Sequence, residues 1–234
     1  MKEQIEIIVN SKDLKEITSD ILEKVLDNQI SDEVLKEIPV VKTLVAIKNV
    51  YTTYTDRIFI KKTMNVLLEL GQVNWKQRVE LTRELDDNEC SGIEKILMAI
   101  NQLETIKKCK VFGKLCKLKA LDKLDVDTFS RLTKLIQDSY LDDLKLITSF
   151  VSQKERKKWK IQEEDYYPLI SLGLIYQEQS EQNPIERAHQ YTGYEPEFKG
   201  GEIEFDYKLS MLGQLFFEYY YDLFPERDCK LNSV

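Results

Sequence analysis

Apolar residues recur every three or four positions through most of the first 150 residues, which is the spacing of one face of an α-helix. An early example is the stripe Leu14, Ile17, Ile21, Val25 and Leu26, which has charged residues opposite it. Short polar turns separate the successive stripes. The pattern predicts about seven or eight helices by residue 153. Because the connections are short, neighbouring helices are expected to pack antiparallel in a bundle.

Residues 40–54 are apolar on most of their circumference, so we expect a helix that begins at Pro39 and lies at the centre of the bundle. The next helix is predicted over residues 55–70, with Thr55 or Asp56 as its cap and Gly71 as its end. Residues 4–10, QIEIIVN, alternate between polar and apolar. They fit a short strand about as well as a helix.

The pattern changes after residue 163. The sequence there predicts a short helix, a glycine stop and a strand, followed by a polar, wing-like loop over 179–201. Residues 202–210 alternate and predict a second strand, and residues 211–224 predict a closing helix. The predicted fold class is therefore mainly α: a multi-helix bundle followed by a small α+β module that resembles half of a winged helix.

Charge divides the chain in the same region. Residues 1–160 hold 29 basic and 26 acidic residues, whereas residues 161–234 hold 5 and 15. We therefore predict a helical bundle over 1–155 and a winged-helix-like module over 156–234, joined near the basic stretch SQKERKKWK. No run approaches the ~18 apolar residues of a membrane span, and the first residues do not resemble a secretory signal. These features predict a cytoplasmic protein.

Several phrases carry a resemblance to a known family. They are EIPVVKTLVAIKNV (37–50), TDRIFIKKTMNVLLEL (55–70), IEKILMAINQLETIKKCKVFGKLCKL (93–118), LDVDTFSRLTKLI (124–136) and YLDDLKLI (140–147), with LISLGLI and YKLSMLG near the C-terminus. Together they resemble the bacterial abortive infection alpha family over most of residues 35–215. The resemblance implies a cytoplasmic helical protein in an antiphage or mobile-element context, and it implies no known catalytic residues.

Metal and nucleophile motifs are weak in this sequence. Cys109 and Cys116 are seven residues apart, but no second Cys/His pair completes a zinc site, so we expect free thiols. The single histidine, His189, lies in a polar segment that has no serine or cysteine in a recognisable nucleophile motif. Asp206 and Lys208 follow the acid at 197 in the order of a metal-dependent nuclease, without the usual α/β core. We predict a protein that is not an enzyme and uses no cofactor or metal.

A row of four lysines is the first candidate contact surface. Lys107, Lys110, Lys114 and Lys117 fall on one face of the helix predicted near residues 106–119. The row lacks arginine and interleaved aromatic residues. It could be a solvated face, a contact for a protein partner or for the acidic C-terminal module, or a phosphate-binding surface.

Aromatic residues near the C-terminus form the second candidate. Phe217, Tyr220, Tyr221 and Phe224 belong to a segment whose aromatic residues cover too much of a helix for a single core face. The helix is therefore either sandwiched or exposes a patch for a partner or a second copy of the chain.

The stretch YTDRIFIKK sets charges between apolar runs. Asp56, Arg57 and Lys61 could mark a capped helix boundary with a basic rim or form a buried network that ties the bundle together. The predicted function is a non-catalytic phage-defence or mobile-element-associated protein that binds another protein. A nucleic-acid-binding regulator that uses residues 107–119 is the first alternative. A membrane-acting effector that releases the apolar segment 38–54 is the second.

Overall fold

The computed structural model describes residues 2–26, 39–50, 53–156, 166–179 and 205–225. The described residues are mainly helical, with one two-stranded antiparallel sheet, which confirms the predicted fold class. The chain forms two compact units, one from residues 1–141 with the segment that begins at Tyr220, and one from Asp142–Tyr219. These units are bounded differently from the domains 1–155 and 156–234, and that domain division stays a prediction.

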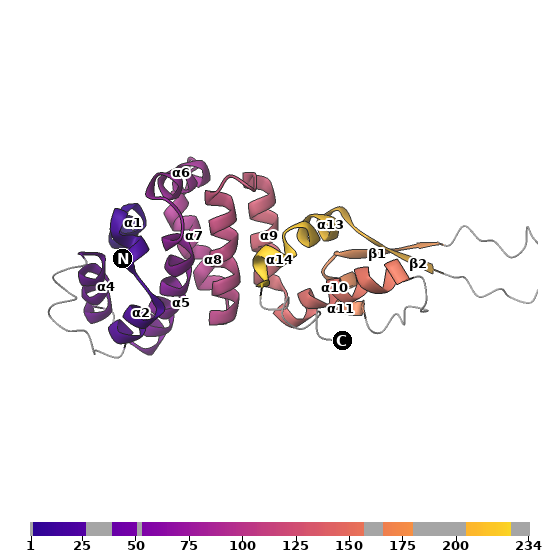
Figure 1. Ribbon diagram of the computed structural model, residues 1–234, viewed down its shortest axis with the longest axis horizontal. Helices are drawn as coiled ribbons and strands as arrows, with labels where there is room; N and C mark the ends of the chain where they lie inside the picture. The colour runs from indigo at the N-terminus through magenta and orange to yellow at the C-terminus, as the bar shows by residue number, and fades with distance from the viewer. Residues whose placement is uncertain (1, 27–38, 51–52, 157–165, 180–204, 226–234) are drawn as a thin grey trace, which may run out of the picture. The chain divides into compact units, whose positions relative to one another are not determined.

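The first unit is a set of helices that runs along the chain from indigo to pink, together with the yellow helix α14 (Figure 1). Its elements are α1 (Lys2–Asn10), the 3₁₀ helix η1 (Lys12–Glu16), α2 (Ser19–Leu26), α4 (Pro39–Val50), α5 (Tyr54–Gly71), α6 (Trp75–Leu85), α7 (Gly92–Gln102), α8 (Ile106–Ala120), α9 (Val126–Asp138) and α14 (Tyr220–Leu223). Helix α1 occupies the alternating segment 4–10, so that segment is a helix and not a strand. Helix α4 begins at Pro39, as predicted.

Helices α5 and α8 make the most extensive contact between helices in the described part of the chain. They run parallel, because Lys62 is near Cys109 at one end and Gln72 bonds to Lys117 at the other. Gly113 allows the close approach, since a Cβ atom there would lie 3.1 Å from the Cα of Val66. The main pair thus joins parallel helices that are not consecutive, and the expected antiparallel pairing of neighbours does not describe it.

The centre of the first unit is α8, rather than the predicted helix over 40–54. Helix α8 contacts α5, α6, α9 and α14, whereas α4 contacts α1, α2 and η1. Residues on most sides of α8 are buried, including two lysines, Lys108 and Lys119. Because four other lysines interrupt its apolar pattern, the sequence did not indicate how deeply this helix is buried.

A buried arginine joins three elements of the first unit. The side chain of Arg78 in α6 is 1% exposed. Its Nε atom donates to the carbonyl of Val9 at 2.7 Å, and its guanidinium also donates to the carbonyl of Ser11. The same group donates to Leu70 at 3.3 Å and to Val73. One charged side chain therefore donates to carbonyls in the last turns of α1 and α5 and to carbonyls just beyond these helices. Carbonyl groups at the C-terminal end of a helix have no partner within that helix.

The second unit contains α10 (Leu141–Arg156), α11 (Tyr167–Ser171), β1 (Ile175–Gln179), β2 (Phe205–Leu209) and α13 (Met211–Glu218). The strands pair antiparallel, with Ile175 opposite Leu209. Gly173 ends the turn after α11 with a φ of 68°, so the predicted glycine stop is confirmed. Helix α10 continues through Arg156, and the first residues of the predicted basic hinge are therefore helical.

The two C-terminal phrases LISLGLI and YKLSMLG meet in space. The amide of Ser210 donates to the carbonyl of Leu174 at 2.9 Å, and the Ser210 hydroxyl caps α13 by accepting from the amide of Gly213. A Cβ atom on Gly213 would lie 1.9 Å from the Leu174 carbonyl oxygen, so this contact requires glycine. The predicted wing-like loop lies outside the described residues.

The predicted closing helix is divided in two at Tyr219, whose backbone (φ −99°, ψ 4°) separates α13 from α14. The two parts bury aromatic residues in different units. Phe216 is buried in the second unit, and Tyr220 is buried in the first.

Candidate interaction surface

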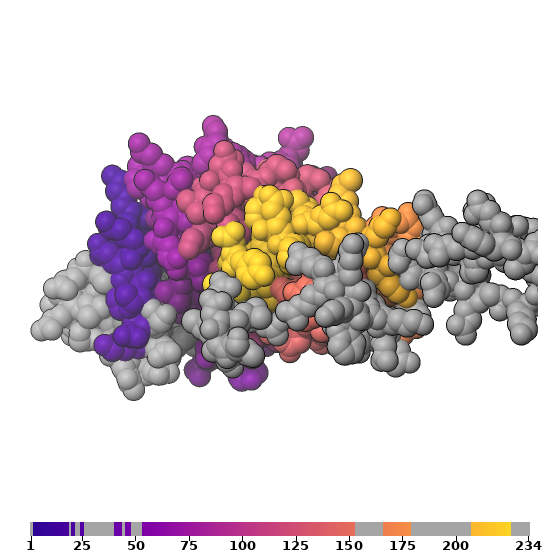
Figure 2. All heavy atoms as spheres, turned by 45° about the vertical axis from the view of Figure 1, so that its right-hand side comes forward, coloured from indigo at the N-terminus to yellow at the C-terminus, as the bar shows by residue number. Residues whose placement is uncertain are grey.

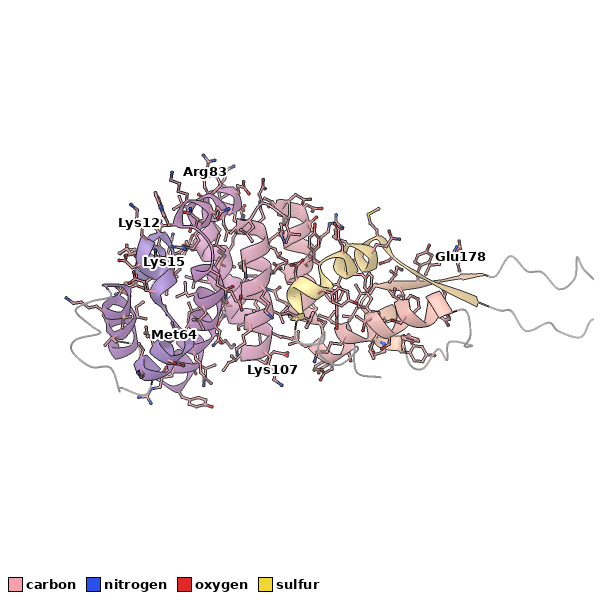
Figure 3. The ribbon with its side chains drawn as sticks, in the orientation of Figure 1. Lys12, Lys15, Met64, Arg83, Lys107 and Glu178 are labelled. Atoms are coloured by element: carbon pink, nitrogen blue, oxygen red, sulfur yellow. The ribbon has the colours of Figure 1, made fainter. Side chains whose placement is uncertain are left out.

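The four predicted lysines all lie on α8, but they differ in exposure. Lys107 and Lys110 are exposed, and Lys114 and Lys117 are half-buried. Figure 3 shows Lys107 at the N-terminal end of α8, pointing away from the other helices of the first unit. The ammonium group of Lys114 donates to the carbonyl of Leu223 at 3.2 Å, and that of Lys117 donates to Gln72 at 2.6 Å. The C-terminal half of the row is therefore engaged by neutral groups of the same unit.

Two further lysines of α8, which the sequence did not single out, are buried. Lys108 donates to the carbonyl of Gln137 at 2.9 Å and lies 3.4 Å from the Glu104 carboxylate. Lys119 pairs with Glu84 of α6. The spacing of Glu104 and Lys108 by four residues is the one local feature of the sequence that indicates a partner for either buried lysine. The partner of Lys119 is 35 residues away, which no local pattern reveals.

The short helix α14 packs on α8 within the first unit. Tyr220 and Leu223 are fully buried, and the Phe224 ring stacks on that of Tyr220 with the centroids 5.1 Å apart. Tyr221 is 48% exposed, and its ring stands edge-on to Tyr220 at 5.3 Å. In Figure 2, the yellow atoms of the C-terminal helices are seen at the surface.

The four aromatic candidates therefore do not form a single patch. Tyr220 belongs to the core of the first unit, and Tyr221 and Phe224 reach its surface. Phe217 is a half-buried residue of α13 in the second unit. The exposed part of the predicted interface is reduced to α14 and the residue that follows it.

The stretch YTDRIFIKK marks a helix boundary. Thr53 is the N-cap of α5 and accepts from the amide of Asp56 at 3.2 Å, while the Asp56 carboxylate accepts from the Thr53 amide at 3.3 Å. Neither Thr55 nor Asp56 is the cap, and Asp56 instead completes a capping box. Arg57 and Lys61 are exposed. The buried network of these residues is therefore wrong, and the capped boundary describes them.

The nuclease-like residues have other partners or lie outside the described residues. Lys208 of β2 forms an ion pair with Glu178 of β1, which is labelled in Figure 3. Asp206 stands opposite Glu178 in the strand register. Glu197 and His189 lie in the part of the chain that the structure does not describe. The ammonium group of Lys208 is thus neutralised within the sheet.

The thiols of α8 are packed in the core. Cys109 and Cys116 are free and fully buried. Burial raises the pKa of the Cys109 thiol to about 11, with the nearby charge of Lys62 acting in the opposite direction, and burial raises the pKa of Cys116 further. Protonated, buried thiols are poor nucleophiles and poor metal ligands.

Within the described ranges, no group of three or more His, Cys, Asp or Glu side chains is placed to hold a metal ion. No described helix combines the length and apolar character needed to cross a membrane. Compared with known proteins, the chain matches no family model, no curated protein and no solved structure.

Proposed function

We propose that this chain is a non-catalytic bacterial protein that acts in phage defence, or in association with mobile elements, by binding another protein in the cytoplasm. The observation that carries the proposal is the exposed ring of Tyr221, held on α14 against the buried ring of Tyr220. The biological setting is supported by the resemblance of residues 35–215 to the abortive infection alpha family.

Helix α14 is fixed on both sides of Tyr221. Tyr220 and Leu223 are buried, and Lys114 bonds to the carbonyl of Leu223. Asp222 lies 3.8 Å from the ammonium group of Lys123. An aromatic ring presented by such a fixed segment loses little conformational entropy on binding, and aromatic residues are enriched at the centres of protein interfaces. This surface therefore suits a protein partner.

The rival function is metal-dependent nuclease catalysis through Asp206 and Lys208. That chemistry needs a lysine free to act beside two metal-bound carboxylates. The pairing of Lys208 with Glu178 supports a structural role for this lysine on the strand pair.

The experiment measures plating efficiency of a phage panel on cells that express the chain. We expect protection by the wild type, and a loss of about tenfold or more with Tyr221→Ala, since truncation of an aromatic anchor weakens binding by more than ~1 kcal/mol. The control is Tyr167→Ala, which removes an equally large exposed ring (55% exposed) from the second unit. Lys208→Ala should protect as the wild type does. Absence of protection against every phage, or loss of protection with Lys208→Ala, would contradict the proposal.

A further inference from the structure

The lysine row of α8 continues onto the neighbouring helix α5. The two helices run parallel, and Lys62 of α5 is near enough to Cys109 of α8 for its positive charge to lower the pKa of that thiol against the effect of burial. At the other end of the contact, Gln72 of α5 accepts from Lys117. One surface along the contact of α5 and α8 therefore collects five lysines. We call it the basic seam: Lys62, Lys107, Lys110, Lys114 and Lys117.

The basic seam has no carboxylate partners among the described residues. Some lysines elsewhere in the first unit are paired, as Lys95 is with Asp87 and Lys134 is with Asp138. None of the five seam lysines forms an ion pair in the described ranges, although the chain carries 41 acidic and 34 basic residues. Glu69 lies beside the seam, where its carboxylate accepts from Gln72 at 3.4 Å. The positive charges of these five lysines are thus not neutralised by ion pairs within the described ranges. The seam therefore favours binding of an anionic ligand.

The chemistry of the seam favours phosphate over an acidic protein. Lysine is depleted at the cores of protein interfaces, whereas it binds phosphate readily as a point charge. From Lys107 to Lys117, the row extends about 15 Å at the rise of an α-helix. Duplex DNA presents one negative charge per ~1.7 Å of its axis, so a row of this length meets several phosphates.

We propose that the basic seam binds the phosphate backbone of duplex DNA without reading its sequence. Lys107 and Lys110 are exposed and supply the primary contacts. Lys114 and Lys117 each donate one hydrogen bond to a neutral acceptor. Because an ammonium group has three N–H donors, each can also donate to a phosphate. Base reading in the major groove needs arginine, lysine, asparagine or glutamine side chains aligned with base edges, whereas lysine binds a phosphate as a point charge without such alignment. The seam contributes lysines, and its neighbour Gln72 is held by Lys117 and Glu69.

The test measures binding of the full chain to a fluorescent duplex of about 25 base pairs by anisotropy, from about 20 to 200 mM salt. With four to five contacts, the slope of log affinity against log salt should be about −4. Lys107→Ala combined with Lys110→Ala should weaken binding and reduce the magnitude of the slope by about 2. Two duplexes of unrelated sequence should bind equally.

The matched control is Lys95→Ala combined with Lys134→Ala, which removes the same charge from two paired lysines outside the seam. It should retain the slope of the wild type, and circular dichroism of both variants should match the wild type. No duplex binding at the lowest salt, or an equal slope in both double variants, would overturn the proposal. Binding to duplex RNA alone, or equally tight binding to a polyglutamate peptide that is lost in the seam variant, would also overturn it. These outcomes do not depend on Tyr221, so this proposal and the proposed function fail separately.

Discussion

The ammonium group of Lys114 and the carbonyl oxygen of Leu223 lie 3.2 Å apart, although the two residues are separated by 109 positions. This hydrogen bond connects the central helix α8 with the last described helix, α14. It also satisfies a carbonyl at the C-terminal end of α14, where a cation is favourable. Residues far apart in the sequence thus form one surface, which carries Tyr221.

Leu223→Ala is expected to release α14 from α8. Truncation of a buried leucine costs about 2–5 kcal/mol, and Leu223 is one of the two fully buried residues of this four-residue helix. Hydrogen exchange should show faster exchange of the Phe224 amide, which donates to the Tyr220 carbonyl at 2.8 Å. Tyr221→Ala, at an exposed site of the same helix, should leave this amide protected. Equal protection in both variants would contradict the anchoring role of Leu223.

Arg78→Met should strongly lower the free energy of unfolding. The substitution keeps an unbranched side chain but leaves the buried carbonyls of Val9 and Val73 without this donor. Each buried acceptor without a partner costs about 1–3 kcal/mol, so we expect a loss of at least about 3 kcal/mol in urea denaturation. Arg83→Met on the same helix removes an exposed pair with Glu80 and should cost less than about 1 kcal/mol. Similar losses in the two variants would show that the buried hydrogen bonds contribute little.

Arg78 also shows where sequence reasoning reaches its limit. The helical periods and the order of helix, strand, strand and helix were predictable, because spacing of apolar residues and glycine positions act locally. A lone arginine in a polar helix reads as a surface residue, since its partners Val9 and Ser11 are 69 and 67 positions away. The burial of Lys119 was hidden for the same reason. The lysine row was predictable as a face of α8, but its extension to Lys62 needed the parallel packing of α5 and α8.

Thr53→Ala should destabilise the start of α5. The hydroxyl of Thr53 accepts from the Asp56 amide, and loss of an N-cap costs about 1 kcal/mol. Thr55→Ala is the matched control, because Thr55 is an exposed threonine inside the first turn. Thermal unfolding should show a lower melting temperature for Thr53→Ala only. A larger effect of Thr55→Ala would support the cap that was expected from the sequence.

Gly92→Ala should destabilise the contact between α6 and α7, although alanine ordinarily favours a helix over glycine. A Cβ atom at Gly92 would lie 2.1 Å from the carbonyl oxygen of Thr82, which belongs to the backbone and cannot rotate away. We expect a loss of about 1–3 kcal/mol in urea denaturation, as for overpacked cores. The control is Gly173→Asn, at an open position with a φ of 68° that asparagine tolerates. A neutral Gly92→Ala variant would mean that α6 and α7 can separate at little cost.

The carboxylate of Glu94 links the start of α7 to α1 and should contribute a measurable pH dependence. Lys2 lies 2.9 Å from this carboxylate, and the Ser91 amide and hydroxyl donate to it at 3.0 and 2.9 Å. The ammonium group of Lys2, followed by these hydrogen bonds, lowers the pKa of Glu94 to about 2. Because the folded pKa lies below the ordinary value of about 4.3, folding favours the ionised form.

The stabilisation from Glu94 is therefore complete above about pH 4.3 and is lost as the pH falls toward about 2. Glu94→Gln removes this ionisation, so its melting temperature should fall less steeply than that of the wild type between those two pH values. Glu89→Gln, at an exposed residue of the preceding loop, serves as the control and should follow the wild-type curve. The difference should shrink at high salt, since the Lys2–Glu94 pair is partly exposed and is screened. Parallel curves for Glu94→Gln and the wild type would show that Lys2 and Ser91 do not favour the ionised carboxylate in the folded chain.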